Sequence, residues 1–170
     1  MKSKNKIYLK DSMEVADLYL KIAQNDEKAA VELEKQKLYN QSAYFYIQAM
    51  EKQITNYIAR KIDITNKYYA DQLKKTMGHS LEEALNLLLT VYCENDENLK
   101  LQISDQIVSQ VLKGKDLKFL HNNVRYPTYK SSYKDYIFEE INAEDCQELN
   151  GMLQALKKYL KELQNRYMFF

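Results

Sequence analysis

Helix-breaking residues are scarce in this chain of 170 residues, which contains one proline and three glycines. Gly78, Gly114 and Gly151 are isolated from one another, and this excludes the glycine-rich loops that cradle phosphates in many nucleotide-binding folds. Cys93 and Cys146 also stand far apart, which indicates two reduced thiols and not a disulfide framework. The two histidines of the chain have no cysteines or carboxylates clustered around them, so the sequence predicts no metal site.

Net charge and long apolar runs are nearly absent as well. The formal net charge is +1 at pH 7, so no global field draws the protein toward nucleic acid or an anionic membrane, and any anion site must be local. The apolar run at Leu87–Leu89, with Val91 and Tyr92 after Thr90, is far too short to span a membrane, and no apolar signal segment follows the basic N-terminus. These features predict a cytoplasmic protein that does not associate with membranes.

Helical periodicity, in contrast, runs through every long segment of the chain. It predicts an all-α fold: an up-and-down bundle of four long helices plus short helical pieces, as one domain over residues 1–170 with a core at about 12–165. The expected helices run from an Asp11 cap to about Leu38, from Ser42 past Ile62 toward Tyr68, from Ser80 through Tyr92, from Leu99 to a stop at Gly114, and onward from Asn142 with Asp145.

The helix that begins near Ser42 is expected to be the central one, with Ser42 as its N-cap. Its apolar residues repeat at helical spacing, and Ile54 is predicted to be buried. The last helix carries a second stripe, and the apolar residues 167–170 follow it. We expect these features to pack on another helix or on a second protomer, because apolar surface is costly to expose. The stripe consists of Leu149, Leu153, Leu156, Leu160 and Leu163.

Arg125-Tyr126-Pro127 interrupts the helical pattern and contains the only proline and one of the three arginines. Proline fixes its own φ angle and restricts the preceding residue, so this triplet predicts a rigid turn. Arginine binds phosphate with a planar, bidentate group, whereas lysine is a solvated point charge. Arg125 is therefore a stronger candidate for an anion contact than any of the lysines.

Several segments, taken in order, resemble the HEPN family of small helical domains, whose name refers to nucleotide binding in higher eukaryotes and prokaryotes. The segment 43–52 reads AYFYIQAMEK, and the segment 78–85 reads GHSLEEAL. The Arg125-Tyr126-Pro127 triplet and the acidic helix start at 142–145 come next. The resemblance extends over roughly residues 12–165, and it is strongest for the branch of the family that carries an Arg-Tyr-Pro motif.

This resemblance implies an up-and-down bundle that forms a homodimer and associates with nucleotide or RNA, often beside a nucleotidyltransferase-type partner. The candidate ligand-binding residues are Arg125, Tyr126, His121 and Lys52, and no cofactor is expected. Glu51 and Pro127 are expected to be structural. These last two residues lie in the central helix and in the turn, respectively.

Many members of the family are ribonucleases that carry an arginine, then four to six residues, then a histidine. Here the segment 115–121 reads KDLKFLH, which keeps the histidine without the arginine, and lysine cannot reproduce a bidentate clamp on phosphate. The sequence therefore favours a non-catalytic module. His121 is the one candidate for general acid–base catalysis, because imidazole titrates near neutral pH.

Alternatives remain open at each of these positions. Arg125 either contacts a phosphate or pairs with Glu51 to hold the turn, and the ion pair is favoured. The tyrosines from Tyr126 to Tyr136 either stack on bases or cover a loop, and His121 either caps a helix or contacts a ligand. A metal-independent ribonuclease and a structural protein–protein interaction domain are the competing functions.

Overall fold

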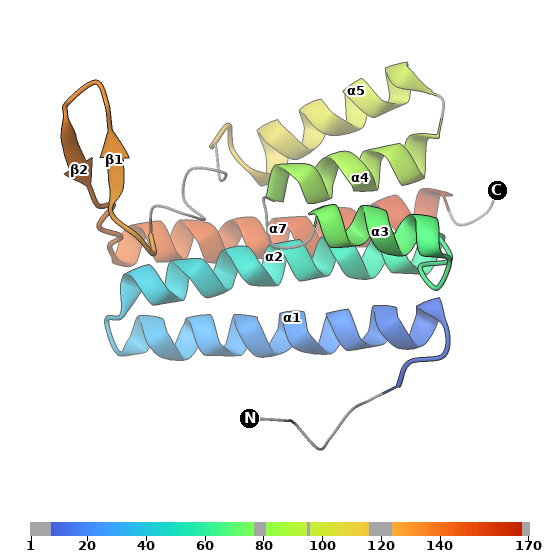
Figure 1. The fold of residues 1–170 in the computed structure, drawn as a ribbon, viewed down its shortest axis with the longest axis horizontal. Helices are drawn as coiled ribbons and strands as arrows, with labels where there is room; N and C mark the ends of the chain where they lie inside the picture. Colours follow the sequence, from blue (N-terminus) through green and yellow to red (C-terminus); the bar gives the residue numbers. More distant parts are fainter. Residues whose placement is uncertain (1–7, 77–80, 95, 116–123, 168–170) are drawn as a thin grey trace.

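The computed structural model describes residues 8–76, 81–94, 96–115 and 124–167. Over these residues the fold is all-α, as predicted, and Figure 1 shows the long helices side by side in an up-and-down bundle. None of the described helices is both long and apolar enough to cross a membrane. The elements are α1 (Ser12–Lys35), α2 (Tyr39–Lys61), α3 (Lys67–Thr76), α4 (Leu81–Cys93), α5 (Glu97–Gln106), the π-helical turn η1 (Ile107–Val111), β1 (Thr128–Lys130), β2 (Asp135–Ile137) and α7 (Ala143–Tyr167).

Two helix starts follow from local capping chemistry. Asp11 Oδ1 accepts a hydrogen bond from the Glu14 amide at 2.9 Å and so caps α1. At the start of α7, Asn142 Oδ1 accepts from the Asp145 amide at 3.1 Å, and the Asn142 amide donates to Asp145 Oδ2 at 3.0 Å. This reciprocal pair is a capping box. Both predicted starts are confirmed.

The turn between α1 and α2 is tighter than the sequence predicts. Lys37 adopts a left-handed conformation, with φ of 62°, and the Leu38 amide donates to the Leu33 carbonyl at 2.9 Å. This Schellman arrangement reverses the chain within a few residues. As a result α2 begins at Tyr39, and the prediction of Ser42 as its N-cap is wrong.

Ser42 instead belongs to a seam of small buried side chains between α1 and α2. Its hydroxyl donates to the Ala30 carbonyl at 2.9 Å, and Asn56 Nδ2 donates to the Ala16 carbonyl at 2.6 Å. These two bonds fix the antiparallel register of the helices, and α1 packs almost entirely on α2. The seam residues are spaced seven apart on each helix and are all buried: Ala16, Ala23 and Ala30 on α1, with Ser42, Ala49 and Asn56 on α2.

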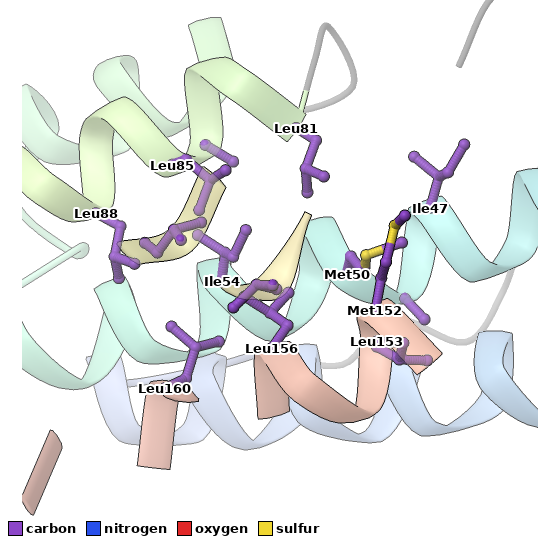
Figure 2. Close-up of a cluster of buried hydrophobic side chains, with 14 of the residues drawn as sticks. Ile47, Met50, Ile54, Leu81, Leu85, Leu88, Met152, Leu153, Leu156 and Leu160 are labelled. Carbon is purple, nitrogen blue, oxygen red and sulfur yellow. The ribbon is translucent and has the colours of Figure 1, made fainter. Parts of the chain in front are cut away.

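As predicted, α2 is the central helix, since it packs against α1, α7 and α4. Ile54 has no exposed surface, which confirms the predicted core face. Figure 2 shows side chains from α2, α4 and α7 meeting in one cluster. The residues labelled in this cluster are Ile47, Met50, Ile54, Leu81, Leu85, Leu88, Met152, Leu153, Leu156 and Leu160.

The central helix ends earlier than the sequence predicts. It stops at Lys61, and Ile62 is extended, with φ of −123°. The Ile64 amide then donates to Ser12 Oγ at 2.8 Å, and Ser12 Oγ donates to Asp63 Oδ1 at 3.2 Å. These contacts tie the chain to the start of α1. The predicted continuation toward Tyr68 is therefore wrong, because tertiary hydrogen bonds break the helix and α3 begins anew.

The predicted fourth helix is present as α5 followed by η1. Asp96 caps α5 by accepting from the Leu99 amide at 2.9 Å. In the π-helical turn the Leu112 amide donates to the Ile107 carbonyl at 2.9 Å, one residue farther back than in an α-helix. Gly114 follows with φ of 72°, and the predicted stop is confirmed, because this conformation suits glycine.

The β-hairpin is an element that the sequence did not predict. Strands β1 and β2 are antiparallel, with Tyr129 opposite Tyr136. Each strand has three residues, too few for a period of two to stand out from the surrounding tyrosines. Pro127 directly precedes β1, a position where its missing N–H is tolerated.

The apolar stripe of the last helix packs inside the bundle, so the expectation that it meets another helix is confirmed. Its five leucines are buried in the common core, and α7 packs against α2 and η1. Residues 168–170 of the predicted terminal patch lie outside the described residues. The apolar stripe is thus covered by other helices of the same chain.

Replacing Ile54 with alanine should lower the free energy of unfolding by roughly 2–4 kcal/mol, because it removes a fully buried side chain and leaves a cavity. Thermal and urea denaturation would measure the change. The exposed Leu101 on α5 provides the control, since Leu101→Ala removes a similar volume from the surface. Equal melting temperatures for Ile54→Ala and the parent protein would contradict the packing of α2.

Replacing Ala23 with leucine should separate α1 from α2 and cost about 1–3 kcal/mol, because the seam has no room for a larger side chain. Ala29→Leu is the matched control. It makes the same change on the same helix at a partly exposed position, and leucine and alanine have similar helix propensities. If both variants melt alike, the seam is not closely packed.

Candidate functional site

A pocket of about 310 Å³ lies where the first two turns of α2 meet the two ends of the hairpin segment. Asn40 holds this junction together. Its Nδ2 donates to the Val124 carbonyl at 3.2 Å and to the Glu139 carbonyl at 2.6 Å, while its Oδ1 accepts from the Ile141 amide at 3.1 Å. We call this the Arg125 pocket, and its lining consists of Asn40, Gln41, Tyr44, Phe45, Val124, Arg125, Tyr126 and Phe138.

Arg125 is exposed, and its guanidinium lies over two tyrosine rings of the pocket. Its guanidinium carbon is 4.6 Å from the ring centre of Tyr44 and 4.9 Å from that of Tyr126. Arg125 Nη2 also donates to the Tyr126 hydroxyl at 3.0 Å. Both ring distances fall within the range of cation–π attraction. The rings therefore hold the guanidinium in place without neutralising its charge.

The favoured ion pair between Arg125 and Glu51 is wrong. Among the described residues no carboxylate forms a salt bridge with Arg125, and its contacts go to Tyr44 and Tyr126 instead. Tyr44 lies two helical turns before Glu51 on α2, so the arginine is held at the end of the helix. Tyr126 is exposed, so its ring lies at the surface and not in the core of the bundle.

Glu51 lies inside the bundle, with 7% of its surface exposed. Its Oε2 accepts from Gln48 Nε2 at 2.9 Å. Burial raises the pKa of Glu51 to about 7, although the Lys52 charge and the Gln48 hydrogen bond lower it in part. This carboxyl therefore changes its charge near neutral pH, and the expectation that it has a structural place in α2 fits its burial.

Lys52 contacts other side chains of the bundle and does not line the Arg125 pocket. Its Nζ lies 2.6 Å from Asp26 Oδ2 on α1 and 2.9 Å from Gln48 Oε1. Both charged side chains are largely shielded from solvent. The contacts connect α1 to α2 beside the small-residue seam, and they give Lys52 a role in packing the two helices.

His121 lies outside the described residues, so the structure does not place this candidate catalytic group. Cys93 and Cys146 are buried, and burial raises the pKa of both thiols, which makes them poor nucleophiles. Within the described ranges, no group of three His, Cys, Asp or Glu side chains could hold a metal ion.

Asn40 and Tyr44 are the site residues that sequence reasoning missed. No role was predicted for Asn40, and Tyr44 was part of the HEPN-like segment without a role of its own. The sequence contains one usable signal for Tyr44. It is an aromatic residue at the solvent-facing start of a helix, where a tyrosine ring can support a cation. Nothing local indicates Asn40, because its partners are about 84 to 101 residues away along the chain.

No protein-family model matches this chain, and no curated protein or solved structure has a significant similarity to it.

Replacing Glu51 with glutamine should stabilise the protein at pH 8 more than at pH 5. The carboxyl has a pKa of about 7 when folded and an ordinary value of 4.5, so the folded state favours the neutral form. Its destabilising effect is complete above pH 7 and disappears as the pH falls to about 4.5. The expected gain at pH 8 is on the order of 1–3 kcal/mol.

Denaturation of the parent protein and the Glu51→Gln variant at both pH values would measure this gain. Glu32→Gln is the control, because Glu32 is exposed and pairs with Lys35 within the same helix. Its effect should be small at both pH values. Equal stabilisation by Glu51→Gln at pH 5 and pH 8 would show that this carboxyl ionises normally.

Proposed function

We propose that this chain is a HEPN-like helical module that binds nucleotide or RNA through the Arg125 pocket and does not catalyse a reaction. The observation that carries the proposal is the guanidinium of Arg125, which is supported by two tyrosine rings and faces solvent. An arginine held in this way keeps its planar donors available for a phosphate. The same rings offer faces on which a base can stack.

The position of the pocket on α2 adds a second source of positive potential. Asn40, Gln41 and Tyr44 belong to the first turns of a helix of 23 residues. Leu38 stands at its N-cap and has no side-chain acceptor for the first amides. The N-terminus of a helix favours anions, because its free N–H groups carry partial positive charge. A phosphate near Arg125 would benefit from both effects.

The lining of the pocket supports binding more than catalysis. Its polar groups are the amides of Asn40 and Gln41, two tyrosine hydroxyls and the Arg125 guanidinium. None of the described residues that line the pocket carries an imidazole, the group that most often acts as a general base, or a carboxylate. The volume lies at the lower end of the range for small-molecule sites.

The assembly that we propose follows from the family resemblance. The segments 43–52, 78–85, 125–127 and 142–145 occur in the order that the HEPN family has. We therefore expect a cytoplasmic homodimer that works beside a nucleotidyltransferase-type protein. Because the leucine stripe of α7 is buried within the bundle, the dimer contact in this proposal uses another surface.

Replacing Arg125 with alanine should weaken the binding of adenosine monophosphate by on the order of tenfold at low salt, because a charge-assisted contact to phosphate is lost. The difference from the parent protein should shrink as salt is raised, since exposed charges are screened. The melting temperature should stay nearly unchanged, because Arg125 is exposed. Isothermal titration and thermal melts would measure both effects.

Arg166→Ala is the control, because it removes another exposed arginine, near the C-terminal end of α7. Arg125→Lys keeps the charge and loses the planar contact with the rings, so its affinity should fall between those of the parent and the alanine variant. Unchanged affinity of Arg125→Ala at low salt would contradict the proposed site.

A further inference from the structure

The β-hairpin projects from the end of the bundle and displays a pair of tyrosines. Figure 1 shows β1 and β2 standing clear of the stacked helices, and each strand pairs mainly with the other. Tyr129 and Tyr136 are opposite each other, with ring centres 5.4 Å apart and planes at 62°. They are 54% and 68% exposed. We call this pair the hairpin tyrosine face.

The hairpin segment gathers several exposed aromatic side chains in one part of the chain. The described part of the chain has other exposed large apolar side chains, but they are scattered over several elements. An isolated two-stranded hairpin is only marginally stable in water, and exposed aromatic clusters commonly mark binding surfaces. The exposed aromatic residues of this segment are Tyr126, Tyr129, Tyr133, Tyr136 and Phe138.

Basic side chains lie at the start of the hairpin segment and in its turn. Between Val124 and Phe138 the basic residues are Arg125, Lys130 and Lys134, and Asp135 is the acidic one. Asp135 Oδ1 accepts a hydrogen bond from the adjacent Tyr136 amide at 2.8 Å. Two further carboxylates, at positions 139 and 140, follow at the base of the hairpin. Lys130 of β1 lies opposite Asp135 of β2, so the excess of positive charge lies at Arg125 before β1 and at Lys134 in the turn.

We infer that the hairpin tyrosine face is a stacking platform for single-stranded RNA, and that it continues the Arg125 pocket. The inference rests on the proposed function, which supplies the class of ligand, nucleotide or RNA. It adds that the ligand is a single strand of RNA and not a free nucleotide. Tyr126 and Phe138 line the pocket at the base of the hairpin, and the paired tyrosines lie beyond them on β1 and β2. Aromatic rings beside basic side chains are the usual means of binding single strands without sequence preference.

The geometry favours RNA over a protein strand added to the hairpin. Each strand contributes only three residues, which gives a short backbone edge for strand addition. The exposed feature is the face of the tyrosine side chains. A duplex is also a poor fit, because its bases are stacked on one another and cannot reach these rings.

The test compares two probes, adenosine monophosphate and a single-stranded oligoadenylate of about twelve nucleotides, within the usual site sizes of single-strand binding folds. Replacing both Tyr129 and Tyr136 with leucine should weaken oligoadenylate binding by on the order of tenfold or more and leave monophosphate binding unchanged. Replacing both with phenylalanine keeps the rings and should keep the affinity. Fluorescence anisotropy would measure the oligoadenylate, and titration calorimetry the monophosphate.

Tyr68→Leu is the matched control. Tyr68 is 64% exposed and lies edge-on to Tyr69 at 5.2 Å, in a comparable pair on α3. Its replacement should not change RNA binding. Lys134→Gln offers a test that keeps both tyrosines. If the RNA backbone follows the hairpin, the slope of log affinity against log salt should fall by about 0.7, the value for one phosphate contact on a single strand.

The outcomes separate the inference from the proposed function. Full oligoadenylate affinity in the leucine double variant would overturn the inference, and the Arg125 pocket would stand if Arg125→Ala still lost monophosphate binding. Equal binding of a duplex would also overturn it. A change in sedimentation without a change in RNA affinity would assign the tyrosines to an interface between copies of the chain. If the parent protein binds the oligoadenylate through the tyrosines but does not bind the monophosphate, the pocket fails and the platform remains.

Discussion

The close contact between α1 and α2 is the constraint on which the other helix contacts depend. Ser42 and Asn56 donate to the carbonyls of Ala30 and Ala16, and small side chains between these bonds let the two backbones approach. A sliding of one helix along the other would break both hydrogen bonds and bury unpaired polar groups. The rotation of α2 is thereby fixed, and its remaining faces meet α4 and α7.

The register of this seam also decides where charge can be buried. It brings Asp26 beside Lys52, and Glu27 of the same helix lies 3.0 Å from Lys157 of α7. Glu51 faces the interior of the bundle, where desolvation favours its neutral form. At the N-terminal end of α2, Asn40 donates hydrogen bonds to both ends of the hairpin segment. One helix therefore organises both the core and the Arg125 pocket.

Local chemistry was enough to predict much of the fold. The caps at Asp11 and Asn142, the stop at Gly114 and the buried face of Ile54 all follow from residues near one another in the sequence. The failures have tertiary causes. Ser42 has the side chain of a typical N-cap, yet its hydroxyl bonds to another helix. The hairpin was missed because a strand of three residues is too short to show an alternating pattern. The role of Asn40 was missed because all its hydrogen-bond partners are distant in the sequence.

The contact predicted for Arg125 was wrong for a related reason. The sequence favoured an ion pair between Arg125 and Glu51, but Glu51 accepts a hydrogen bond from Gln48 on its own helix. Arg125 instead lies on the ring of Tyr44. This arrangement leaves its charge exposed at the N-terminal end of α2, where the helix dipole has the same sign. In a chain with a net charge of +1, the positive potential at this end of α2 is therefore local, and the adjacent tyrosine rings are the reason for proposing an anionic ligand that carries an aromatic group.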